Sequence, residues 1–183
     1  AAMISIALAD PPELPAESRD VFLPFVGGPP PVVAVDVSPV AAFYRLLVTD
    51  QRQQRPHLER CADLEAAALW KARDLAPNNY WSHRASTGEM PNTTARRHGC
   101  ALPAYYGAGN QVESLVAGSD SASVMFAALA GSPAHRVHLF GENDTFRQQA
   151  HVGIAMAVAE RADSMFRYYW TVYISVCGEC CAV

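Results

Sequence analysis

The feature that most constrains the fold is a pair of strand-type segments near the C-terminal end. Residues 166–176 are dense in aromatic and β-branched side chains, and residues 151–159 alternate larger apolar side chains with small ones. A short polar stretch, residues 160–164, separates the two runs. Two such runs joined by a polar turn predict an antiparallel hairpin.

The middle of the chain is patterned for helices. Ser38 followed by Pro39 is a typical helix start, and apolar residues recur at helical spacing from there towards residue 53. Three further helices are expected: one in the alanine-rich run 64–75, one over 91–98, and one that begins at Asp120 or Ser121 and ends before Pro133. Helices first and strands last favour an α+β fold over alternating β-α-β units.

Proline content divides the chain. Residues 1–37 are proline-rich and contain Pro29-Pro30-Pro31, which favours extended polyproline-type backbone and excludes an interior strand. We expect an N-terminal arm over 1–37 that lies on the domain, with a mobile tail as the alternative. A single domain over 38–176 and a cysteine-containing tail over 177–183 complete the expected organisation, which suits a chain of 183 residues.

Charge and hydropathy exclude two classes of partner. A net charge of −4 gives no basic footprint for nucleic acid. No apolar run approaches the roughly 18 residues that a membrane-spanning helix needs. The apolar first ten residues lack a positively charged start, so they do not resemble an intact signal peptide. We therefore expect neither a nucleic-acid partner nor a membrane span.

Five cysteines are present, at positions 61, 100, 177, 180 and 181. Cys61 and Cys100 flank the second and third expected helices and are predicted to pair. That bond would close a loop of about 40 residues, worth roughly 3–4 kcal/mol in loop-entropy models, and would agree with export. Cys177 and Cys180 form a C-x-x-C pattern, but only three residues follow it. A structural role is favoured over a redox pair, which needs a helix N-terminus behind it.

Histidine and carboxylate side chains can bind a divalent metal or transfer protons near neutral pH. Among the six histidines, His83 and His135 are each expected just outside a helix, in a loop that contains glycine or proline. Loops held by a rigid scaffold are where functional groups concentrate. His57 and His98 are expected to be solvated, and His151 opens a strand. A structural role for His83 and His135 is the alternative that these residues alone leave open.

Five short motifs occur in one order along residues 40–176. They are Tyr80-Trp81-Ser82-His83 with Gly88, Asn110-Gln111-Val112-Glu113-Ser114-Leu115, Ser132-Pro133-Ala134-His135-Arg136, Val152-Gly153-Ile154-Ala155 and Tyr169-Trp170-Thr171-Val172. Together they resemble the CAP family, the cysteine-rich secretory, antigen 5 and pathogenesis-related proteins, in its bacterial SCP-like form.

The resemblance implies a three-layer α-β-α sandwich with a small antiparallel sheet, in a secreted or cell-surface protein with a central cleft. His83 matches the family's first cleft histidine, Glu113 a cleft glutamate and His135 the second histidine. The family's second glutamate would fall at Leu129, so the fourth member of the set is absent. His138 is a further candidate ligand, with packing or solvent exposure as the alternative.

Two neutral imidazoles and one carboxylate suffice for a zinc-type site with an open position for water. The same three groups could instead hold one another by hydrogen bonds. We expect an extracellular binding module whose cleft holds a lipid, glycan or peptide ligand, or a divalent metal. The alternative is a metal-assisted hydrolase that uses His83, His135 and Glu113, and the missing second carboxylate counts against it. A third hypothesis is a vestigial cleft with partner contacts made by the proline-rich arm.

Overall fold

The computed structural model describes residues 38–178, so the expected arm and most of the expected tail lie outside the described residues. Within this range the chain contains, in order, α1 (Pro39–Thr49), β1 (Glu59–Arg60), α2 (Ala62–Asn78), α3 (Pro91–Arg97), the 3-10 helix η1 (Ala104–Tyr106), β2 (Glu113–Ala117), α4 (Ala122–Gly131), α5 (Pro133–Phe140), α6 (Asp144–Arg147), β3 (His151–Val158) and β4 (Tyr168–Ser175).

The four strands form one sheet in the order β1-β3-β4-β2. The predicted C-terminal hairpin is present as β3 and β4, which pair antiparallel from His151 opposite Ser175 to Val158 opposite Tyr168. β2 adds to the other side of β4, also antiparallel. The expectation of an antiparallel sheet is corrected at one edge, because β1 runs parallel to β3. The sheet is therefore mixed, and neither β1 nor β2 was predicted.

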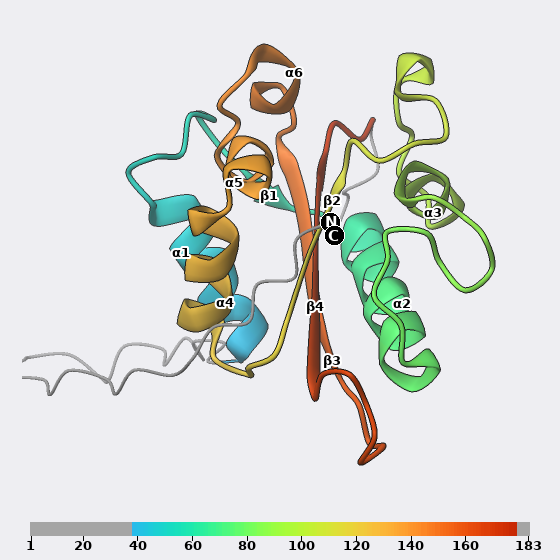
Figure 1. Ribbon diagram of the computed structural model, residues 1–183. Coiled ribbons are helices and arrows are strands. Elements are labelled where there is room, and N and C mark those ends of the chain that lie inside the picture. Colours follow the sequence, from blue (N-terminus) through green and yellow to red (C-terminus); the bar gives the residue numbers. More distant parts are fainter. Residues whose placement is uncertain (1–37, 179–183) are drawn as a thin grey trace, which may run out of the picture. The chain divides into compact units, whose positions relative to one another are not determined.

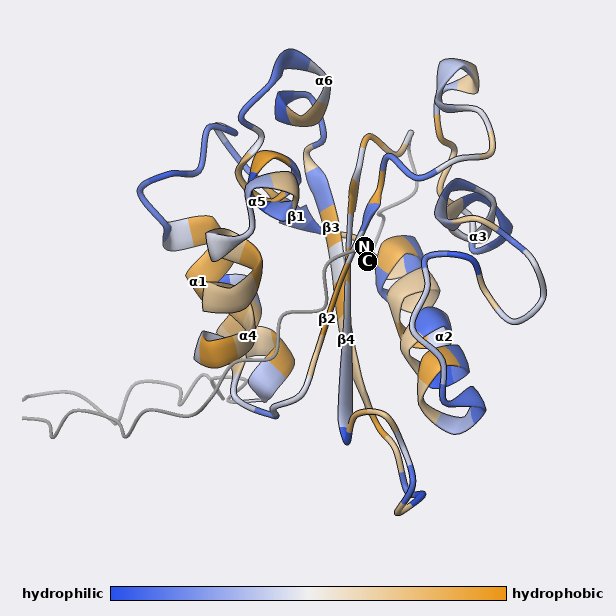
Figure 2. Ribbon diagram, in the orientation of Figure 1, coloured by the Kyte–Doolittle hydropathy of each residue, from blue (hydrophilic) through white to orange (hydrophobic). Residues whose placement is uncertain are grey.

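Helices cover both faces of this sheet, which gives the expected three layers (Figure 1). α2 and α3 lie on one side, and α1, α4 and α5 lie on the other. Figure 2 shows that α1 and α4 are largely apolar, whereas the loop between α1 and β1 is hydrophilic. Among residues 38–178, none of the helices combines the length and hydrophobicity that crossing a bilayer requires.

Alternate residues of β4 supply both halves of the core. Trp170, Val172 and Ile174 join an apolar cluster with side chains of α1, α4 and α5. Thr171 and Tyr173 face the other layer, where the Thr171 hydroxyl donates to a main-chain carbonyl of α2 at 2.7 Å. Side chains that alternate between two covered faces explain why this strand is apolar almost throughout.

Gly153 allows α2 to lie directly on the sheet. A Cβ atom at this position of β3 would overlap the backbone of Leu64 and Glu65 in α2. A glycine within a strand is typical of such a close backbone approach. The position of α2 matters for the site, because the segment that follows this helix carries His83.

The helix starts follow the predicted capping chemistry. Ser38 caps α1, with its hydroxyl accepting from the Ala41 N–H at 3.2 Å, and Ser121 caps α4. Ser132 and Pro133, expected to lie in a loop after α4, instead begin a further helix, α5.

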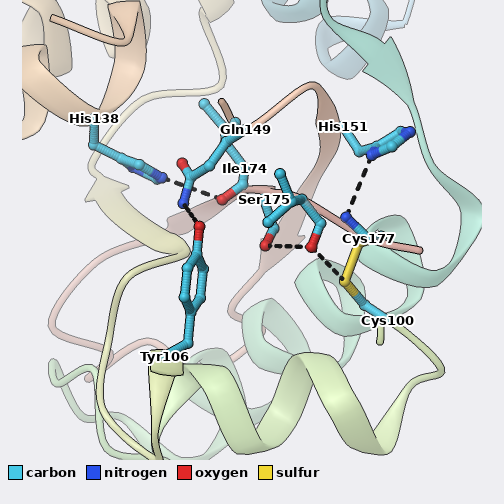
Figure 3. Close-up of a disulfide and its surroundings, with 9 residues drawn as sticks. Cys100, Tyr106, His138, Gln149, His151, Ile174, Ser175 and Cys177 are labelled. Atoms are coloured by element: carbon cyan, nitrogen blue, oxygen red, sulfur yellow. Dashed lines mark hydrogen bonds between the residues drawn. A yellow bond between two sulfur atoms is a disulfide. The ribbon is translucent and has the colours of Figure 1, made fainter. Parts of the chain in front are cut away.

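The predicted disulfide between Cys61 and Cys100 is wrong. Cys100 is bonded to Cys177, 77 positions further along the chain, and Cys61 is itself disulfide-bonded. Figure 3 shows the Cys100–Cys177 bond where the segment after β4 passes the loop that follows α3. Spacing along the sequence does not reveal that β4 ends beside this loop, and cysteine positions alone do not determine connectivity.

Candidate functional site

The structure brings His83 and Glu113 into direct contact. Glu113 is the first residue of β2, and its side chain is fully buried, whereas 41% of the His83 side chain is exposed. Glu113 Oε1 accepts a hydrogen bond from His83 Nδ1 at 2.7 Å. Glu113 Oε2 accepts a second one from the Tyr173 hydroxyl, also at 2.7 Å. Both carboxylate oxygens are therefore engaged within the protein.

This arrangement fixes the tautomer of His83. A carboxylate oxygen can only accept, so Nδ1 carries a proton, and in the neutral imidazole Nε2 is the nitrogen that has the lone pair. No hydrogen-bond partner of His83 Nε2 occurs between residues 38 and 178. An imidazole oriented through Nδ1 by a carboxylate can bind a metal ion or accept a proton through Nε2.

Asn110 holds the start of β2 in place. Its side-chain oxygen accepts from the Glu113 N–H at 2.9 Å, and its amide group donates to the Glu113 carbonyl at 3.1 Å. The Asn110 Nδ2 atom also lies 3.1 Å from His83 Nδ1. Asn110 therefore fixes the backbone that carries Glu113 at the point where Glu113 meets His83.

His135 lies within α5, not outside a helix as expected. Its Nδ1 atom is 2.9 Å from the hydroxyl of Ser132, the residue before the first turn. Burial, and secondly the charge of His83, lower the pKa of His135. His135 is therefore neutral at neutral pH and lies within electrostatic range of His83.

His138 is a packing residue. It is buried in α5, where its ring contacts Phe146. The Ser114 hydroxyl donates to Nδ1 at 2.8 Å. Nε2 donates to the Ile174 carbonyl at 3.4 Å, as Figure 3 shows. Burial, with a smaller effect of the Arg55 charge, lowers the pKa of His138 to about 3. With both nitrogens bonded, His138 has no lone pair for a metal.

The remaining histidines have no part in the site. His57 is exposed, as predicted, but His98 is partly buried rather than solvated. His151 begins β3 and accepts from the Cys177 N–H at 3.4 Å. Leu129, at the position of the missing second glutamate, is buried in the core.

A buried polar network that was not predicted from the sequence joins α2 to the segment after it. Lys71 of α2 is 1% exposed, and its ammonium donates to the Tyr80 hydroxyl at 2.9 Å. The Tyr80 hydroxyl donates in turn to Asp74. Burial lowers the pKa of Lys71, and the charges of Glu113 and Asp74 act in the opposite direction. The sequence does contain one sign of this network. Lys71 and Asp74 are three positions apart and fall on the apolar face of α2, where charged residues are unusual.

Fewer residues are available to bind a metal than the three that were expected, because Glu113 is engaged elsewhere. Glu113 uses both oxygens for His83 and Tyr173. Within the described range, 38–178, no group of three or more histidine, cysteine, aspartate or glutamate side chains is arranged to hold a metal ion. The two imidazoles of His83 and His135 are the groups at this site that suit one, because both can present a neutral nitrogen.

Comparison with known proteins identifies the fold. No protein-family model matches the sequence, and no curated protein matches it. The structure is similar to that of an extracellular protein containing an SCP domain from Bacillus anthracis str. Ames, with a TM-score of 0.56 and 18% identity. The chain has the fold of an SCP domain. The match covers 75% of this chain and 40% of the Bacillus protein, so this chain spans about two fifths of that protein's length.

A second similar structure covers most of both chains. It is an outer surface protein from Borrelia burgdorferi, with a TM-score of 0.54 and 18% identity, and it covers 73% of this chain and 89% of that one. Within this fold, three separate elements bring together the bonded residues of the candidate site: the segment after α2 carries His83, β2 carries Glu113 and β4 carries Tyr173. The other candidate, His135, lies on α5.

Proposed function

We propose that this protein is an extracellular binding module that holds a divalent metal such as zinc through His83 and His135. The observation that carries the proposal is the hydrogen bond from His83 Nδ1 to the buried carboxylate of Glu113. Metal-binding histidines commonly donate their other ring N–H to a carboxylate, which fixes the ring and strengthens the ligand. Imidazole nitrogen suits zinc, copper and nickel, whereas magnesium and calcium prefer oxygen.

Placement outside the cell is supported by two observations. The two similar structures are described as an extracellular protein and an outer surface protein. The Cys100–Cys177 disulfide is of the kind that persists in oxidising compartments.

Binding is favoured over metal-assisted hydrolysis because of where Glu113 lies. A general base must reach the water that it deprotonates. The Glu113 side chain is fully buried, and both oxygens accept hydrogen bonds from protein groups. Glu113 therefore orients His83 and is poorly placed to accept a proton from a metal-bound water. A lipid, glycan or peptide would be bound through the open positions that two protein ligands leave on the metal.

The test is zinc titration of protein prepared without a histidine tag. We expect one zinc ion per chain in the wild type and at least a tenfold weaker affinity, about 1.4 kcal/mol, in His83→Ala and in His135→Ala. His57→Ala is the matched control because His57 is exposed and outside the site. Unchanged affinity in either site variant, or no binding by the wild type in excess zinc, would refute the proposal and leave a hydrogen-bonded structural cluster.

A further inference from the structure

A single buried carboxylate, that of Asp74, ties down the segment that carries His83. Asp74 lies in α2 and is 9% exposed. It accepts from the Asn78 amide at 3.0 Å, from the Ser86 N–H at 2.9 Å, and from the hydroxyls of Tyr80 and Ser86. All of these donors belong to the end of α2 or to the segment that follows it.

His83 lies midway between two of these contacts. Tyr80 comes three residues before it and Ser86 three residues after it. Asp74 therefore closes the loop 80–86 at both ends, with His83 at its centre. Glu113 then holds the imidazole from the side of the sheet. The loop that carries His83 is thus bonded to one buried carboxylate through Tyr80 and Ser86, and the His83 ring is bonded to another, that of Glu113.

The positive charge of Lys71 helps to stabilise the buried negative charge of Asp74. Its ammonium lies one turn before Asp74 on the same helix and donates to Tyr80, which bonds to Asp74. Burial raises the pKa of Asp74, but the hydrogen bonds from Ser86 and Tyr80 outweigh that effect, so the pKa is lowered overall. Asp74 is therefore ionised at neutral pH and acts only as an acceptor, which its four donors require.

We propose that Asp74 is a positioning residue, which closes the loop 80–86 and so places the His83 ring against Glu113. Asp74 touches no ligand in this scheme and acts through His83. The consequence for zinc binding rests on the function proposed above. The placement of His83 does not depend on that function and can be measured without any metal.

The variant Asp74→Asn tests the proposal. An amide keeps the shape of the carboxylate but turns one acceptor oxygen into a donor NH2 group, which faces a donor of Tyr80 or Ser86. The matched control is Glu65→Gln on the same helix, because Glu65 pairs with the exposed Arg60 and not with the loop. Full-length protein is used throughout.

The primary measurement is NMR of the His83 ring in metal-free protein. In the wild type and in Glu65→Gln we expect the Nδ1-protonated tautomer, with a slowly exchanging ring proton. In Asp74→Asn that signal is lost, and amide hydrogen exchange quickens about tenfold in residues 80–86 while β3 and β4 keep their protection. Zinc affinity falls about tenfold in the same variant.

Retention of the His83 ring proton in Asp74→Asn would overturn the proposal. If Asp74→Asn fails to fold, Ser86→Ala removes one donor and leaves the carboxylate in place. Loss or faster exchange of the ring proton in Ser86→Ala supports the proposal, and an unchanged signal overturns it. If wild-type protein binds no zinc, the metal function fails, but the ring signal still decides the role of Asp74.

Discussion

Glu113 and Tyr173 lie directly opposite each other on β2 and β4, and the Tyr173 hydroxyl donates to Glu113 Oε2 at 2.7 Å. Tyr173 is fully buried, and burial, followed by the Glu113 charge, raises its pKa well above the ordinary value. The hydroxyl therefore stays protonated and remains a donor. Burying a carboxylate costs free energy unless its oxygens accept hydrogen bonds. The bond from Tyr173 satisfies one of the two Glu113 oxygens.

The variant Glu113→Gln should keep the fold and weaken zinc binding by about 10–100-fold, the usual effect of losing a group that orients a metal-binding histidine. The amide cannot accept from both His83 and Tyr173 in the way that a carboxylate does. Zinc titration beside thermal unfolding measures both effects. Global unfolding of the variant would show instead that Glu113 chiefly stabilises the fold, and unchanged affinity would remove it from the site.

Loss of the Cys100–Cys177 bond should destabilise the protein by about 2–4 kcal/mol, because the unfolded chain gains freedom. The bond joins the loop after α3 to the end of β4. Urea unfolding of a Cys100→Ala, Cys177→Ala double variant measures the loss. Peptide mapping without reductant should recover a Cys100–Cys177 linked peptide, and a Cys61–Cys100 peptide would contradict the structure.

Stability should fall with acidity through His138. Its pKa is about 3 in the folded protein, against about 6.5 in an unfolded chain. The unfolded state therefore takes up the proton first, so this contribution is complete above about pH 6.5 and is lost as the pH falls towards 3, by at most about 1.4 kcal/mol per pH unit. Urea unfolding between pH 7 and pH 4 should show a shallower dependence in His138→Gln and an unchanged one in His57→Ala. Equal slopes in His138→Gln and wild type would contradict the burial of His138.

Gly153→Ala should be among the most destabilising single substitutions, with a loss of about 3 kcal/mol or more, because the added methyl overlaps the backbone of α2. The matched control is Gly131→Ala at the end of α4, where an added Cβ would have no neighbour within 4 Å. Thermal unfolding of both variants measures the difference. A Gly153→Ala protein as stable as the control would show that α2 can move away from β3 at little cost.

The parts of the fold that depend on local sequence were predictable. The β3–β4 hairpin follows from two apolar runs and a polar turn, and the start of α1 follows from Ser38 and Pro39. Ser132 and Pro133 carry the same start signal for α5, but they were interpreted as the end of the preceding helix. β1 was missed because it is two residues long and forms only by pairing with a distant strand.

The residues of the candidate site that lie in recognisable sequence motifs were predictable. His83 was selected for its expected loop position and again from the resemblance, Glu113 from the resemblance alone, and the structure places the two in contact. Asp74 and Lys71 were missed because charged residues in a helix usually face solvent. Their burial depends on how closely α2 lies on the sheet, which Gly153 permits and which no local pattern reveals.

The carboxylate of Glu113, which is buried and accepts two hydrogen bonds, also affects which ions the proposed site would select. Calcium and magnesium are held mainly by oxygen ligands, and several of them. The Glu113 side chain is fully buried, and each of its oxygens already accepts a hydrogen bond, from His83 or Tyr173, so it is a poor ligand for an incoming ion. If the proposed zinc site exists, calcium and magnesium should compete poorly with zinc for the imidazoles of His83 and His135.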